Sequence, residues 1–124
     1  MKKGRLLKLA ALLERVPARK FDMDVWGESK KPAYSEPQCA TKACALGWAT
    51  AIPEFHRAGL HLVAACHGCT SAEVLYRDNG LNPGAEFFGL SEDEEHFLFY
   101  AGAETPKAKA REIREFVRTG VIPE

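Results

Sequence analysis

The stretch of sequence that decides the fold is ACALGWA, at residues 43–49. A helix formed by these residues would be apolar on every side, and a helix of that kind lies in the interior of a domain. Thr41 is a suitable N-cap residue just before the stretch, and the pair Ile52 and Pro53 ends it. The sequence therefore predicts a buried central helix over residues 41–51.

An amphipathic helix is predicted at each end of the chain. The first runs from about Arg5 to Arg15 and stops before Pro17. The last is capped by Thr105 and ends before Gly120. Their apolar faces are formed by Leu6, Leu9, Leu13 and Val16 in the first helix, and by Ala110, Ile113, Phe116 and Val117 in the last. The basic residues of the last helix are expected on its opposite face: Lys107, Lys109, Arg111, Arg114 and Arg118.

Between these helices the sequence predicts one short hairpin. Pro53 opens a single helical turn that Gly59 closes. Residues 60–63 and 73–76 are the only strand-like pieces, and they could pair around the intervening loop.

Two further helices are predicted before the last one. Pro83 starts a short helix that Gly89 ends. Ser91 and Glu94 form a capping box, which starts a helix that continues to Gly102.

The predicted fold class is mainly α, with four to six helices around the buried central helix and one short β-hairpin. At 124 residues the chain is expected to form a single compact domain, 1–124. Residues 17–38 are a long polar loop, in which Phe21, Met23 and Trp26 are expected to fold back onto the core.

Composition excludes several classes of protein. The chain has 17 basic and 17 acidic residues, whereas a dedicated nucleic-acid or membrane-surface protein usually carries excess positive charge. No stretch approaches the roughly 18 apolar residues of a membrane span. We expect a cytoplasmic protein, in which cysteines are reduced, metal-bound or catalytic rather than in structural disulfides.

The cysteines allow two interpretations that the sequence leaves open. They lie in the sequence as two closely spaced pairs, Cys39 with Cys44 and Cys66 with Cys69. Four thiolates suit a tetrahedral structural zinc site. The alternative is two buried cysteines, which act as small hydrophobic residues, and two loop thiols, with no cofactor. The candidate metal ligands are Cys39, Cys44, Cys66 and Cys69, with His61 and His67 as substitutes.

Enzymatic and nucleic-acid functions are weaker alternatives. Cys39 or Cys44 could act as a nucleophile beside a histidine, but no phosphate loop, nucleophile elbow or paired-histidine metal motif is present. His96 is expected to be a half-buried structural histidine. The basic last helix could contact phosphates, yet no aromatic residues that would stack on bases lie among its charges.

The central stretch resembles a group of small uncharacterised bacterial and bacteriophage proteins that share a Cys-Gly-Thr-x-x-Cys-x-x-Gly-x-Ala core. The chain has Ala40 where glycine is usual. The resemblance implies that Cys39, Thr41, Cys44 and Gly47 are the residues to test first, and it implies no reaction. It extends, as short separated motifs, to Phe21-Asp22-Met23 with Trp26, Ile52-Pro53-Glu54-Phe55, Phe87-Phe88-Gly89-Leu90-Ser91 and Thr105-Pro106.

The function expected from the sequence is a non-enzymatic accessory module of bacterial or phage origin that binds a protein partner or a second copy of itself. Trp26 and Tyr34 are the aromatic residues expected to be exposed for such a contact. Thr41, Gly47 and Trp48 are the motif residues of the central helix. The chief alternative is a domain stabilised by one zinc ion.

Overall fold

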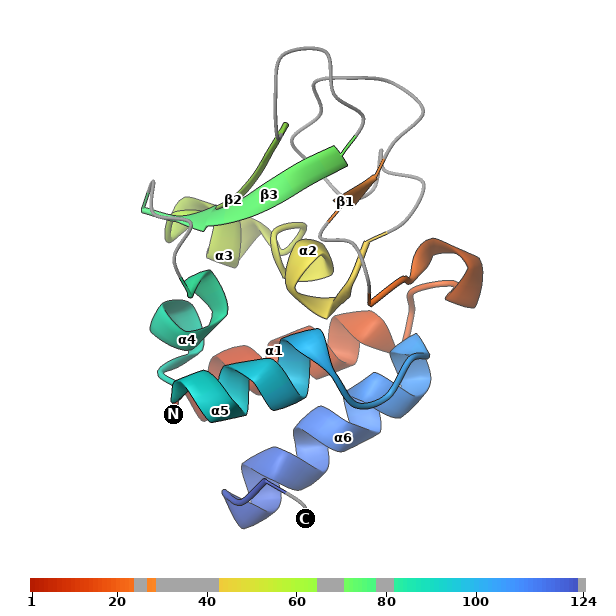
Figure 1. Cartoon of the computed structure of the whole chain (residues 1–124), viewed down its shortest axis with the longest axis vertical. Coiled ribbons are helices and arrows are strands. Elements are labelled where there is room, and N and C mark those ends of the chain that lie inside the picture. Colours follow the sequence, from red (N-terminus) through yellow and green to blue (C-terminus); the bar gives the residue numbers. More distant parts are fainter. Residues whose placement is uncertain (24–26, 29–42, 65–70, 78–81, 123–124) are drawn as a thin grey trace.

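The computed structural model describes residues 1–23, 27–28, 43–64, 71–77 and 82–122 (Figure 1). The fold is mainly α with a short antiparallel hairpin, which confirms the predicted fold class. The sheet lies at one end of the molecule and α1, α5 and α6 lie at the other, with α2 between them. In chain order the elements are α1 (Lys3–Leu13), η1 (Ala18–Lys20), β1 (Gly27–Glu28), α2 (Ala45–Ala49), α3 (Pro53–Arg57), β2 (Leu60–Ala64), β3 (Ser71–Tyr76), α4 (Pro83–Phe88), α5 (Glu92–Glu95), the π-helical segment η3 (His96–Tyr100) and α6 (Pro106–Thr119).

The terminal helices α1 and α6 pack side by side, as their apolar faces predict. Thr105 caps α6, because its hydroxyl accepts a hydrogen bond from the Ala108 amide at 3.2 Å. Gly120 ends the helix in the left-handed conformation that glycine adopts readily. The buried residues of this pair are Leu6, Leu9, Ala10 and Leu13 on α1 and Pro106, Lys109, Ala110, Ile113 and Phe116 on α6.

The central helix is buried along its whole length, but it is shorter than the predicted helix over 41–51. It begins at Ala45, and Cys44 is its extended N-cap residue rather than a helical one. The reason lies just before it: Ala43 forms a parallel β-bridge with Phe21. The Ala43 amide donates to the Lys20 carbonyl, and the Ala43 carbonyl, which a helix would pair with the Gly47 amide, instead accepts from the Asp22 amide, each at 3.0 Å. Thr41, the predicted cap, lies outside the described residues.

The predicted hairpin is present, and β2 and β3 pair in antiparallel register. A third short strand, β1, pairs with the other edge of β3, so the described strands lie in the order β1-β3-β2. The sequence prediction missed β1 because it is two residues long and falls in the predicted loop over 17–38. Leu60, Leu62 and Val74 face the core.

The helices between the sheet and α6 surround a cluster of aromatic side chains. Phe55 and Phe87 meet edge to face at 4.8 Å between ring centroids, and Phe88 lies 5.3 Å from Phe99. The capping box of α5 is present, and Gly89 ends α4 as predicted. The helix that follows does not stay α-helical to Gly102, because residues 96–100 widen into a π-helical turn and the chain then becomes extended.

Candidate functional site

Most of the residues that the sequence singled out lie outside the part of the chain that the structure describes. The zinc site and the exposed aromatic patch therefore stay predictions. The residues concerned are Trp26, Tyr34, Cys39, Thr41, Cys66, His67 and Cys69.

Cys44 is fully buried at the start of α2. Burial raises the pKa of its thiol to about 11, an effect opposed by the backbone amides of Gly47 and Leu46 and by the charge of Lys109. A thiol with this pKa is protonated at neutral pH, and such a cysteine packs as a small hydrophobic residue. The described part of the chain thus favours a structural role for Cys44.

The other two motif residues of the central helix are also buried. Trp48 is 5% exposed, and its indole Nε1 donates a hydrogen bond to the Lys20 carbonyl at 3.0 Å. Gly47 is buried within α2 and accepts a hydrogen bond from the Thr50 hydroxyl. The Trp48 hydrogen bond holds α2 against η1, and the burial of both residues supports a structural role for the motif.

The predicted histidines lie apart from this core. His61 is half-buried on β2, and its ring contacts the ring of His56 on α3. His96 is exposed on η3, which corrects the expectation of a half-buried histidine. Leu98 and Phe99 are the buried residues of this π-helical segment.

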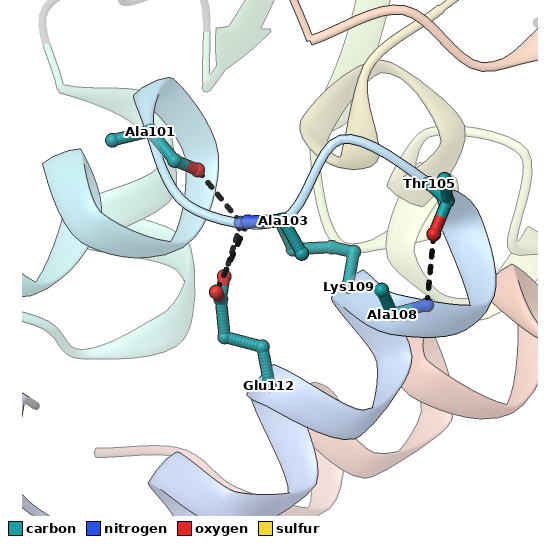
Figure 2. A network of polar contacts seen from close by, with 6 residues as sticks. All are labelled: Ala101, Ala103, Thr105, Ala108, Lys109 and Glu112. Carbon is teal, nitrogen blue, oxygen red and sulfur yellow. Dashed lines mark hydrogen bonds and ion pairs between the residues drawn. The ribbon is translucent and has the colours of Figure 1, made fainter.

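Lys109 lies at the centre of a polar network (Figure 2). Lys109 is fully buried, although it was expected on the outer face of α6 with the other basic residues. Its Nζ donates to the Ala101 carbonyl at 2.8 Å and to the Glu112 carboxylate. The second carboxylate oxygen of Glu112 accepts the Ala103 amide at 3.0 Å. One ion pair therefore ties the link before α6 to the body of the helix.

The network also requires a glycine at position 102, because the Glu112 carboxylate occupies the space that a side chain would need. The φ of Gly102 is +76°, and an added Cβ would lie 2.5 Å from the Glu112 carboxylate. Burial lowers the pKa of Lys109, while the hydrogen bond and charge of Glu112 act in the opposite direction. Because the amine is inaccessible and donates to both the Ala101 carbonyl and the Glu112 carboxylate, we interpret the network as a structural lock rather than a reactive centre.

Glu95 is a second buried charged residue, at the end of α5. It is 2% exposed, and its carboxylate accepts the Ala85 amide at 2.9 Å, at the start of α4. Gly84 lies so close that an added Cβ would be 2.9 Å from this carboxylate. Glu95 thus caps α4 from a neighbouring helix.

One accessible feature of the described surface is a groove between the outer side of α1 and the link from α2 to α3. Its volume is about 350 Å³. Half-buried Leu12, Ala51 and Ile52 supply apolar surface, and Lys8 and Arg15 supply positive charge. The described residues that line it are Lys8, Ala11, Leu12, Arg15, Ala51, Ile52 and Pro53, and together we call them the α1 groove.

The two cations of the α1 groove differ in their pairing. Lys8 Nζ lies 2.5 Å from the Glu54 carboxylate, and both side chains are half-exposed to solvent. Arg15 forms no ion pair with any other described residue. The groove therefore has a guanidinium that is available to an incoming carboxylate.

Comparison of the chain with protein-family models, curated proteins and solved structures gave no match. The resemblance to bacterial and bacteriophage proteins therefore stays a prediction. Among the described residues, no helix is long and apolar enough to cross a membrane. No group of three or more histidine, cysteine or acidic side chains gathers there in a metal-binding arrangement.

Proposed function

We propose that the protein is a non-enzymatic binding module that holds an amphipathic, acidic segment of a partner protein in the α1 groove. The observation that carries the proposal is the combination of an apolar floor with two basic side chains at its rim. The buried network around Lys109 offers a substrate no access, so the accessible groove is the better candidate for function.

The size of the groove favours side chains over a cofactor. Pockets for small molecules span about 300–1,000 Å³ and usually bury most of their ligand. The α1 groove, at about 350 Å³, lies at the low end of that range. A few apolar side chains from a partner would fill it, which is how an amphipathic helix binds in a groove.

The charges define the chemistry of the partner. Lys8 lies on α1 and Arg15 follows the end of the helix at Leu13, seven residues after Lys8, and both line the groove. A helical partner with two acidic residues at the same spacing could meet both cations. Complementary charge of this kind contributes to specificity and association rate more than to affinity.

A defined peptide tests the proposal. The probe is a synthetic helix with leucines on one face and glutamates seven residues apart beside them, and the control is a scrambled peptide of the same composition. We expect the ordered peptide to shift the amide NMR signals of Leu12, Arg15 and Ile52, and added salt to weaken binding. Equal binding of both peptides would contradict the proposal.

Two matched substitutions separate the groove from the rest of α1. Ala11→Glu places a carboxylate between the two cations and should abolish binding. Leu7→Glu makes the same change in charge at a residue that is 43% exposed and does not line the groove, so binding should persist. Equal loss in both variants would assign the effect to the surface of α1 in general.

A further inference from the structure

Two histidines form a contact that neither the core nor the α1 groove uses. His56 lies in the last turn of α3 and His61 near the start of β2. Their ring centroids are 4.4 Å apart, and the ring planes are nearly perpendicular, at 87°. Each position is fixed by buried neighbours, since Phe55 precedes His56 and Leu60 and Leu62 flank His61.

Both rings are accessible to a small ligand. Each histidine is half-buried, so part of its ring reaches solvent. Within the described residues, no hydrogen bond or ion pair engages either imidazole. The two rings contact each other, and their nitrogens keep the capacity to bind a metal ion.

The spacing matches that of two imidazoles on one metal ion. Zinc binds a histidine nitrogen at about 2.0–2.1 Å, which places the ring centroid about 3.2 Å from the metal. Two rings in adjacent coordination positions then have centroids about 4.5 Å apart at a right angle and about 5.2 Å apart at the tetrahedral angle. The observed 4.4 Å is close to the first value, and a tetrahedral ion requires the rings to separate by about 0.8 Å.

We propose that His56 and His61 bind one divalent ion of the late first-row metals, such as zinc, nickel or copper. Imidazole suits these ions, whereas magnesium and calcium prefer oxygen ligands. Two protein ligands leave the other coordination positions to water or to a group from another molecule. His61 was expected to substitute for a cysteine in a zinc site, but the side chain beside it is His56.

The test uses the full chain and two metal ions. Zinc titration by calorimetry gives affinity and stoichiometry, and cobalt(II) reports the ligand type through its absorption spectrum. Loss of an outer-shell partner of a metal ligand already weakens binding by about 10- to 100-fold. We therefore expect His56→Gln and His61→Gln each to weaken zinc binding by at least about tenfold.

His96→Gln is the matched control. His96 is exposed, and its ring centroid lies 6.2 Å from that of Tyr100. Binding in this variant should equal that of the wild type. Circular dichroism of every variant verifies that the fold is kept.

A second measurement needs no substitution. Paramagnetic cobalt(II) should broaden the NMR signals of the His56 and His61 rings first and leave those of His96 sharp. The proposal fails if no zinc binds. It also fails if cobalt shows thiolate charge-transfer bands while both histidine variants keep full affinity, because the cysteines would then hold the metal.

Discussion

Replacing Glu112 with glutamine tests the structural lock around Lys109. The substitution keeps an oxygen that can accept the Ala103 amide but removes the negative charge that faces the buried ammonium group. Removing one partner of a fully buried ion pair costs about 3–5 kcal/mol. The Glu112 side chain is 18% exposed, so water compensates part of the loss and we expect about 2–3 kcal/mol.

The complementary change, Lys109→Met, preserves the length of the side chain and leaves Glu112 with solvent and the Ala103 amide. We expect it to cost about 1–2 kcal/mol, mainly because the Ala101 carbonyl loses its donor. Combining Lys109→Met with Glu112→Gln removes both charges together. The double variant should be less destabilised than the sum of the single variants by at least about 1 kcal/mol.

Urea denaturation of the three variants measures these free energies of unfolding. Glu115→Gln on the same helix is the control, because the Glu115–Arg118 pair is exposed to solvent. It should change stability far less than Glu112→Gln. The reasoning is refuted if the two glutamine variants behave alike, or if the effects of Lys109→Met and Glu112→Gln simply add.

Three further predictions concern single residues. Gly102→Ala forces a side chain into a positive φ and against the Glu112 carboxylate, and it should lower the free energy of unfolding by about 1–3 kcal/mol in thermal melts. The pKa of Cys44 is raised from 9.0 to about 11, so its contribution to stability is complete below pH 9 and is lost as pH rises toward 11, by about 3 kcal/mol at most. Urea titrations across that range should therefore show a steeper alkaline loss in the wild type than in Cys44→Ala, and parallel curves would contradict the assignment. Trp48→Phe removes the hydrogen bond to the Lys20 carbonyl and should cost about 1 kcal/mol, whereas an unchanged urea midpoint would show that the bond contributes nothing.

The elements with local signals were predictable from the sequence. Thr105 and Gly120 mark the ends of α6 through capping chemistry, and Ser91 with Glu94 marks the start of α5. These signals act within one helical turn, so they hold whatever the rest of the fold does. The α2 boundary was wrong because the bridge at Ala43 joins residues that are far apart in the sequence.

The position of Lys109 could have been read from helical periodicity alone. It stands four residues before Ile113 and seven before Phe116, both of which are buried, so the period places it on the inner face of α6. Its charge argued for the opposite face. The sequence did not show that the Glu112 carboxylate and the Ala101 carbonyl both contact the ammonium group of Lys109. These two contacts offset the cost of burying its charge.

The candidate sites required the fold. Lys8, Leu12 and Arg15 are close together in the sequence, but the rest of the groove comes from residues 51–53, which lie far from them along the chain. The contact of His56 with His61 likewise depends on the turn between α3 and β2. Neither arrangement leaves a periodic signal in the sequence.

The bridge between Phe21 and Ala43 also fixes the point at which the chain enters the buried helix α2. The Ala43 amide donates to the Lys20 carbonyl and the Ala43 carbonyl accepts from the Asp22 amide, so this residue is anchored through both of its backbone groups. A force applied to the chain before Ala43 would therefore act on these two hydrogen bonds before it reached the buried helix.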